Sequence, residues 1–236
     1  MIDTHCHLLP SLDDGPGSLA DSVGLARALA TAGVTDVACT PHFSRRYPTP
    51  LVEARAAWRK LGDALEVELP RLSISLAAEF SPQMALDAEP AELLSRTMAN
   101  GYLLVELEPD TPAAVLDLVV ERLDGLGLLP VLAHPERCRA VRGHLRVIDS
   151  ARSAGALVQV VARSLGRDSG QGSAGAAWEL LESGRADLIA SDAHRSEHAY
   201  TTLPNALEAV AKRYGAEALE ALTVEAPSRL ILERTA

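Results

Sequence analysis

The sequence predicts an α/β fold, a distorted seven-stranded (β/α)7 barrel with a metal site at the C-terminal ends of its strands. Three observations predict it. Short apolar runs alternate with stretches of helical periodicity, which is typical of parallel strands joined by helices. Histidines and carboxylates follow these runs, at the end of the strands where such barrels place their reactive groups. The 236 residues are 47% hydrophobic, enough for one large domain over residues 1–236 and few for two.

Seven apolar runs are the predicted strands, and six of them lead to a histidine or a carboxylate. They cover residues 1–7, 34–40, 72–78, 102–105, 130–133, 158–162 and 186–191. The stretches between them with helical periodicity cover residues 18–32, 50–67, 90–97, 112–126, 145–154, 174–184 and 204–214. Because each strand is followed by a helix, the strands are expected to run parallel.

Capping residues mark several helix ends. Ser18, with Asp21 three residues later, is expected to cap the first helix, and Ala32-Gly33 is expected to end it. Residues 164–175 are rich in Gly and Ser and are predicted to form a loop beside the sixth strand. Residues 223–236 are predicted to form a last short helix, with Pro227 in its first turn.

Bulk properties exclude several classes of partner. A net charge of −10 argues against nucleic acid and against anionic membrane surfaces. No apolar run reaches the about 20 residues of a membrane span, and the amino terminus enters a strand without a basic, apolar leader, so no membrane insertion is expected. The three cysteines are an odd number without paired spacing, which predicts a reducing compartment, the cytoplasm.

The ionisable residues at the strand ends indicate a polynuclear metal site. His5 and His7 alternate along the first strand, so their side chains share one face, and Asp192 and His194 form a second alternating pair. A single strand-end residue of this type is more often a surface group or a satisfied polar group than a ligand. Their recurrence at the same end of the strands favours metal binding. The isolated strand-end ligands are His42, Glu79, Glu106 and His134.

The chemistry of this ligand set favours phosphoester hydrolysis. Imidazole and carboxylate ligands without thiolate suit Mn, Fe or Zn, and ligand softness does not choose among them. A cluster of divalent cations activates water and clamps phosphoryl oxygens. An aryl phosphate has a leaving oxygen of pKa about 10 and therefore needs less protonation than an alkyl alcohol, so no dedicated general acid is required.

Seven motifs together resemble the polymerase and histidinol phosphatase (PHP) superfamily, and most closely the bacterial manganese-dependent tyrosine-protein phosphatases of the CpsB/YwqE family. The resemblance extends from Met1 to about Leu232. The motifs are Asp3-Thr4-His5-Cys6-His7, Asp13-Asp14-Gly15-Pro16, Thr40-Pro41-His42, Ala78-Glu79, Leu104-Val105-Glu106, Ala133-His134-Pro135-Glu136-Arg137 and Ser191-Asp192-Ala193-His194.

The resemblance implies a seven-stranded barrel that holds three divalent metal ions, with manganese as the metal. The first ion would be held by His5, His7, Glu79 and Asp192. Glu79 would bridge to a second ion held by Glu106 and His134, and a third would take Asp14, His42 and His194. Asp13 is an alternative to Asp14, because a shift of one residue in that turn would exchange them.

The resemblance also implies a substrate, phosphotyrosine in proteins, and a partner, a cognate bacterial tyrosine kinase that controls capsule or exopolysaccharide synthesis. Arginines are expected to bind the phosphoryl group, since their planar fork matches two phosphate oxygens. Arg137 is the first candidate, because the family has an arginine at this position. Arg195, directly after His194, is the second, although the family carries its arginine a few residues later, where this chain has His198 and Ala199.

Other functions remain as alternatives. Histidinol-phosphate phosphatase would use the same metals, and a metal-dependent amidohydrolase or deacetylase also begins with His-x-His, but Lys60 and Lys212 lie in helical stretches and supply no carboxylated lysine bridge. The spacing Cys39-x5-Arg45 matches thiol-dependent tyrosine phosphatases. We reject that mechanism because Pro41 lacks an N–H for phosphate and the loop has no glycine. A metal-stabilised binding module without turnover is the last alternative.

Overall fold

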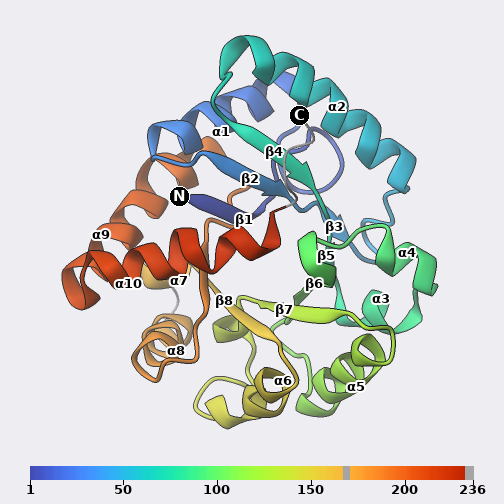
Figure 1. Ribbon diagram of the computed structural model, residues 1–236, viewed down its shortest axis with the longest axis vertical. Helices are drawn as coiled ribbons and strands as arrows, with labels where there is room; N and C mark the ends of the chain where they lie inside the picture. The colour runs from blue at the N-terminus through green and yellow to red at the C-terminus, as the bar shows by residue number, and fades with distance from the viewer. Residues whose placement is uncertain (167–170, 232–236) are drawn as a thin grey trace.

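Parallel strands form the interior of the molecule, and helices cover them (Figure 1). The computed structural model describes residues 1–166 and 171–231. In this part of the chain, one sheet has the order β1-β2-β4 and the other the order β3-β5-β6-β7-β8-β9. The strands are β1 (Ile2–Cys6), β2 (Asp36–Cys39), β3 (His42–Phe43), β4 (Ser73–Leu76), β5 (Glu79–Phe80), β6 (Tyr102–Glu106), β7 (Leu129–Ala133), β8 (Leu157–Val161) and β9 (Leu188–Ala190).

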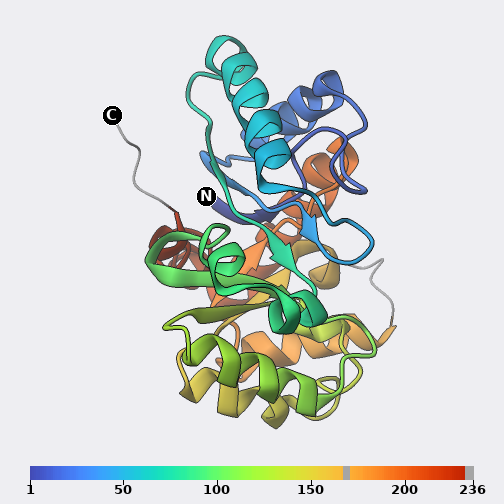
Figure 2. The same cartoon turned by 90° about the vertical axis from the view of Figure 1, so that its right-hand side faces the viewer.

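The helices lie outside the strands. Figure 2 shows α1 and α2 at one end of the molecule and α5 and α6 at the other, with strands between them. The α-helices are α1 (Leu19–Thr31), α2 (Leu51–Glu68), α3 (Pro82–Asp87), α4 (Pro90–Leu94), α5 (Ala113–Asp124), α6 (Asp149–Ser153), α7 (Ala162–Leu165), α8 (Gln171–Glu182), α9 (Leu203–Tyr214) and α10 (Ala216–Glu220). Short 3-10 or π turns are η1 (Ala99–Gly101), η2 (Pro135–Arg137), η3 (Leu145–Ile148), η4 (His198–Thr202), η5 (Ala221–Glu225) and η6 (Pro227–Leu230).

The two sheets meet where the ionisable residues stand. Strand β2 leads into β3 through Thr40 and Pro41, and β4 leads into β5 in the same way, so the chain passes twice from one sheet to the other. The sheets also meet between β1 and the segment after β9. There the His5 carbonyl accepts a hydrogen bond from the Asp192 amide (2.9 Å), and the His7 amide donates one to the Ala193 carbonyl (3.1 Å). The end of β1 and the segment that follows β9 therefore lie side by side at the site.

The predicted α/β class and parallel strands are confirmed. The runs 34–40 and 72–78 each give a strand that breaks and resumes as a two-residue strand at His42 and at Glu79. Ser18 caps α1 as predicted, since its side chain accepts a hydrogen bond from the Asp21 amide, and Gly33 has the positive φ (88°) that suits a helix stop.

Several boundaries differ from the prediction. Most of the predicted loop 164–175 is helical, because α7 ends at Leu165 and α8 begins at Gln171; residues 167–170 lie outside the described residues. Helix α3 was not predicted, although Ser81 caps it and Pro82 opens it. In place of one tail helix over residues 223–236, the structure has two short turns, η5 and then η6, which ends at Leu230. Residues 232–236 of this prediction lie outside the described part. Local turn chemistry decides these short elements, and hydrophobic periodicity does not detect them.

Small aliphatic side chains build the core. The buried residues are mainly Ala, Leu and Val from both faces of the strands, which fits a sheet covered by helices on its outer side. The three cysteines are free thiols and buried. Among the described residues, no helix is both long enough and apolar enough to cross a membrane.

Candidate metal centre

The imidazole side chains of His5 and His7 face each other through their Nε2 atoms. Both side chains are fully buried at the end of β1, and their Nε2 atoms are 3.3 Å apart. The other ring nitrogen of each is already used: His5 Nδ1 lies 2.8 Å from Oε1 of Gln159, and His7 Nδ1 lies 2.7 Å from Oδ2 of Asp13. Since these oxygens accept, each Nδ1 carries a proton, and in the neutral ring each Nε2 then presents a lone pair, which is the arrangement of metal-binding histidines.

Glu79 is the centre of the site. It opens β5 and is fully buried, and its Oε2 atom lies 3.2 Å from Nε2 of both His5 and His7. His42 Nδ1 approaches the same oxygen to 2.9 Å, while His134 Nε2 lies 3.0 Å from Oε1. Although three imidazoles surround Oε2, none meets it in hydrogen-bonding geometry. A buried carboxylate oxygen without a hydrogen-bond donor, facing lone pairs, fits a bound cation.

The charges in this cluster demand a cation. Burial by itself raises the pKa of Glu79, but the neighbouring imidazoles, above all His5, outweigh it and hold the pKa well below the usual range. Burial likewise lowers the pKa of His7, yet the hydrogen bond to Asp13 and the nearby carboxylate of Glu79 raise it well above its ordinary value. Glu79 therefore stays ionised and draws positive charge, which protons on the imidazoles supply when no metal ion does.

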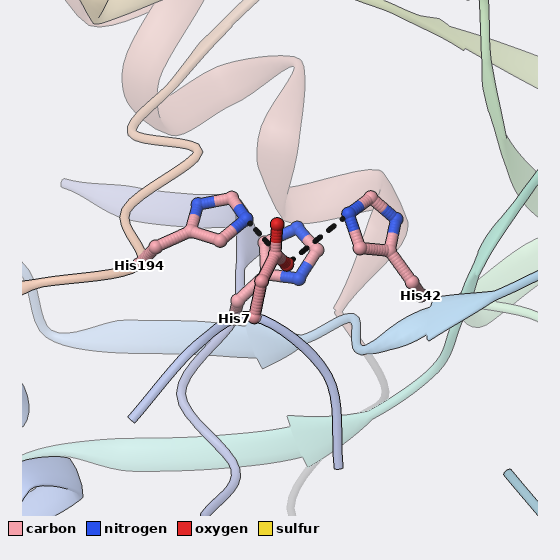
Figure 3. A group of neighbouring side chains, drawn as sticks. His7, His42 and His194 are labelled. Carbon is pink, nitrogen blue, oxygen red and sulfur yellow. Dashed lines mark ion pairs between the residues drawn. The ribbon is translucent and has the colours of Figure 1, made fainter. Parts of the chain in front are cut away.

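A further group of ligands lies at the rim. Oδ1 of Asp14 is 3.2 Å from His194 Nε2 and 3.5 Å from His42 Nε2. The rings of His7 and His194 stack with centroids 3.9 Å apart, and Figure 3 shows His7, His42 and His194 converging on one point. Burial and the neighbouring charge of His7 lower the pKa of His194, so this imidazole is readily neutral, as a metal ligand must be.

The two adjacent aspartates occupy different positions. Asp13 is turned inward, where Oδ2 accepts hydrogen bonds from His7 Nδ1 and from the His42 amide (2.9 Å), and Oδ1 accepts one from the Gly15 amide (2.9 Å). Asp14 faces the rim histidines and makes no such bonds to the residues that the structure describes. The geometry favours Asp14 as the ligand of the pair, and Asp13 orients His7.

Two of the predicted ligands have strained backbone conformations. His134 has φ 35° and Asp192 has φ 50°, in the left-handed region that non-glycine residues rarely adopt. His134 directly follows β7, and Asp192 follows β9 by two residues. Strain of this kind persists at functional sites, where the surrounding contacts hold it in place.

The two predicted arginines are placed differently. Nη1 of Arg137 lies 2.7 Å from Oδ2 of Asp192, whose Oδ1 is 3.5 Å from His5 Nε2. Arg137 therefore fixes the orientation of a predicted ligand, and 29% of its side chain remains exposed to the mouth of the site. Arg195 is exposed, and among the described residues it has no ion pair. The structure brings Arg137 to the cluster but leaves Arg195 at its edge.

All nine predicted ligands fall into four overlapping groups with their ligand atoms within 4.8 Å of one another. The grouping differs from the predicted one, because Glu106 lies with His42 and Glu79, and His7 also joins the rim group. The groups are His7, Asp14, His42 and His194; His5, Glu79 and His134; His5, His7 and Asp192; and His42, Glu79 and Glu106.

Sequence reasoning missed the residues that support these ligands. Gln159 is buried in β8, accepts from His5 with Oε1, and donates from Nε2 to the Thr4 hydroxyl (2.8 Å). Asp3 accepts a hydrogen bond from the Ser191 amide (2.9 Å) and so joins the first strand to the last. A signal was present for Gln159, which interrupts the apolar sequence of strand Leu157–Val161.

The thiol mechanism finds no support. Cys39 is fully buried, and burial raises the pKa of its thiol far above the ordinary value, which opposes formation of the reactive thiolate. Arg45, which completes the Cys-x5-Arg spacing, is 75% exposed and pairs with Asp87 at the surface. Neither residue can serve as in a thiol-dependent phosphatase.

Imidazoles and carboxylates that converge at the C-terminal ends of parallel strands define an α/β protein with a candidate metal site. A family model described as capsular polysaccharide synthesis, CpsB/CapC, matches residues 1–232, and the chain belongs to this family.

Named relatives agree with the family. The tyrosine-protein phosphatase YwqE of Bacillus subtilis is 31% identical over 231 residues, covering 96% of this chain and 90% of YwqE. The tyrosine-protein phosphatase CpsB of Streptococcus pneumoniae is 24% identical over 241 residues, covering 99% of both chains. A solved structure from a study of YwqE and CpsB, described as metal-dependent tyrosine phosphatases, matches with a TM-score of 0.86 and 29% identity, over 100% of this chain and 96% of the other.

Proposed function

We propose that this chain is a metal-dependent protein-tyrosine phosphatase that hydrolyses phosphotyrosine by attack of activated water. Its substrate is a phosphotyrosine protein, a bacterial tyrosine kinase that controls capsule or exopolysaccharide synthesis. The family match over residues 1–232 and the relatives that are named tyrosine-protein phosphatases support this activity.

One observation supports the metal dependence above all. The Nε2 atoms of His5 and His7 face each other at 3.3 Å while both Nδ1 atoms are bonded to oxygens, and the unbonded Oε2 of Glu79 lies 3.2 Å from each. When neither Nε2 carries a proton, two lone pairs and a carboxylate oxygen repel one another at such distances. A divalent cation among them turns this repulsion into coordination.

We propose three ions, with manganese as the metal. His5, His7, Glu79 and Asp192 hold the first, Glu79 with Glu106 and His134 the second, and Asp14 with His42 and His194 the third. Divalent cations supply Lewis-acid neutralisation of phosphoryl oxygens and activation of water for attack. The overlap of the ligand groups, which together contain all nine of these residues, supports more than one ion, and the absence of thiolate suits manganese.

The side chains around the ligands have separate tasks. Asp13 and Gln159 hold the protons of the two Nδ1 atoms and so keep both Nε2 atoms available. Arg137 neutralises one oxygen of Asp192, and its remaining N–H groups are the donors we assign to a phosphoryl oxygen. Arg195 is the second arginine proposed at the mouth.

We further propose that the strands act as one seven-stranded barrel in one domain. The interrupted pairs β2 with β3 and β4 with β5 each count as a single strand in this description, and the hydrogen bonds between β1 and the end of β9 support closure. The free thiols of all three cysteines support action in the reducing cytoplasm.

The test is phosphate release by metal-stripped protein with and without added Mn²⁺. A phosphotyrosine peptide and histidinol phosphate are compared at equal concentration. Manganese-dependent release from the peptide alone is the expected result. Release mainly from histidinol phosphate would move the chain to an alkyl phosphatase, and release from neither would return the amidohydrolase and the binding module to consideration.

A further inference from the structure

A tyrosine stands beside the candidate ligand His42 on the turn that follows β3. The rings of Tyr47 and His42 are nearly parallel, at an interplanar angle of 8°, with their centroids 5.7 Å apart. Parallel rings at this separation are offset, so His42 covers only part of the Tyr47 ring. Tyr47 is partly exposed, and the uncovered part of its ring belongs to the wall of the site.

The turn that carries Tyr47 is closed on itself. The Ser44 amide donates to the Tyr47 carbonyl (3.2 Å), and the Tyr47 amide donates to the Ser44 carbonyl (3.1 Å) and lies 3.2 Å from the Ser44 hydroxyl. Pro48 follows and restricts the backbone of Tyr47 to extended conformations. These contacts fix the position of the tyrosine relative to the end of β3.

Thr49 anchors the same turn to two other parts of the molecule. Its carbonyl accepts a hydrogen bond from Nη2 of the buried Arg96 (2.8 Å), and its hydroxyl donates to the Leu12 carbonyl (3.2 Å), next to the aspartate turn. The guanidinium of Arg96 also lies over the Phe43 ring, 4.1 Å from its centroid. Burying an arginine costs free energy of desolvation, and here the buried Arg96 holds a surface turn in one position.

Arg46 adds positive charge to this wall. Its guanidinium carbon lies 5.0 Å from the centroid of the Tyr47 ring, within the range of a cation–π contact. Arg46 is exposed, on a chain whose net charge is −10. The turn thus presents an aromatic ring and a cation next to the candidate metal centre.

We propose that Tyr47 is a specificity-determining residue that packs against the aromatic ring of the substrate and so favours aryl over alkyl phosphate esters. The inference rests on the proposed phosphatase function. In an aryl phosphate one ester oxygen separates the phosphorus from the ring, so a phosphoryl group held near His42 places its ring within reach of Tyr47. An alkyl phosphate has no ring to place there.

A purely structural role for Tyr47 makes a different prediction. If the ring only supports His42, its removal disturbs the candidate metal centre and weakens the binding of every phosphate ester alike. If the ring contacts the substrate, its removal weakens the binding of aryl esters selectively. The ratio between an aryl and an alkyl ligand therefore separates the two roles.

The experiment compares Tyr47→Ala and Tyr47→Phe with the unaltered protein, all loaded with manganese. Two peptides of one sequence, carrying phosphotyrosine or phosphoserine, are assayed for kcat and KM, and binding of phenylphosphonate and methylphosphonate is measured by calorimetry. Tyr47→Ala is expected to lower kcat/KM for the phosphotyrosine peptide and the affinity for phenylphosphonate by about two- to ten-fold, mainly through KM. Methylphosphonate affinity and metal content should stay unchanged, and Tyr47→Phe, which keeps the ring, should match the unaltered protein.

Tyr200→Ala is the matched control, because Tyr200 is 53% exposed on η4 and has no ring contact with a candidate ligand among the described residues. Equal losses for phenylphosphonate and methylphosphonate in Tyr47→Ala, or equal selectivity in all variants, would overturn the inference. A protein that releases phosphate from neither peptide would overturn the proposed function instead, and the phosphonate pair would still test Tyr47.

Discussion

His7 and Asp13 are joined by a hydrogen bond of 2.7 Å between Nδ1 and Oδ2, and this bond separates the roles of two adjacent aspartates. Asp13 is committed to the imidazole and to two backbone amides, of His42 and of Gly15. Asp14, one residue later, is left to face the rim histidines. One carboxylate orients a ligand, and its neighbour is placed to be one.

Asp13→Asn and Asp14→Asn should therefore fail in different ways. The first should weaken manganese affinity by about 10- to 100-fold without changing the number of ions bound at saturation, because it removes support from His7. Asp14→Asn should lower the number of manganese ions bound at saturation by one, because it removes a proposed ligand. Elemental analysis of saturated protein together with manganese titration measures both. Loss of an ion from Asp13→Asn alone would reverse the assignment.

Glu79→Gln should abolish turnover. Oε2 of Glu79 lies near three imidazoles, and an amide nitrogen or a neutral oxygen there cannot balance the cations. Cys39→Ser should retain most activity, since the buried thiol takes no part. The measurement is phosphate release at saturating manganese, with folding checked by circular dichroism. An inactive Cys39→Ser beside an active Glu79→Gln would revive the thiol mechanism.

Arg137→Lys should lower kcat/KM by roughly 10- to 100-fold, because an ammonium cannot hold Asp192 and a phosphoryl oxygen at once. Arg195→Lys, at an exposed position, should lower kcat/KM by a much smaller factor. Steady-state kinetics on a phosphotyrosine peptide, with metal content determined for each variant, separates substrate binding from loss of metal. Equal effects of the two substitutions would remove Arg137 from its proposed role.

The stability of metal-stripped protein should fall at both ends of the pH scale. Burial raises the pKa of Asp13, but the hydrogen bond and charge of His7 and the amides of His42 and Gly15 outweigh it and lower the pKa to about 2. This carboxylate contributes about 2 kcal/mol above its ordinary pKa, and the contribution is lost as the pH falls towards 2. His7 has a raised pKa, so its contribution is complete below the ordinary value of 6.5 and is lost as the pH rises through the folded pKa.

Added manganese should restore the stability that the metal-stripped protein loses as the pH rises. Metal ions compete with protons for imidazole, so the stabilisation by manganese should grow between about pH 6 and pH 8. Thermal unfolding of stripped and loaded protein across this range measures the effect. Asp13→Asn in the stripped protein should flatten the acid limb. A manganese effect that does not vary with pH would show that the ion does not displace protons from these histidines.

The convergence of the strand-end residues could be predicted because each follows an apolar run with a readable period. His5, Glu79 and His134 stand where an apolar strand stops, and parallel strands bring such ends together whatever the details of the sheet. The α/β class follows from the same alternation. The helix over 82–87 and the breaks at Pro41 and Ala77-Ala78 depend on turns of a few residues, which periodicity cannot resolve.

The supporting residues were harder to predict. Asp13 and Gln159 act through hydrogen bonds to histidines 6 and 154 positions away, and sequence spacing does not carry such distances. The pairing of Arg137 with Asp192 likewise joins two residues that are far apart in the sequence. A buried polar residue inside an apolar strand, as at Gln159, is the one signal that the sequence held.

The contact between β1 and the end of β9 bears on how the protein is made. His5 and His7 are translated before Asp192 and His194, and the backbone hydrogen bonds that join the two segments can form only after the later one has been made. Until then the two histidines lack these neighbours. A product that stops before β9 would therefore lack part of the candidate site, even though both histidines are present.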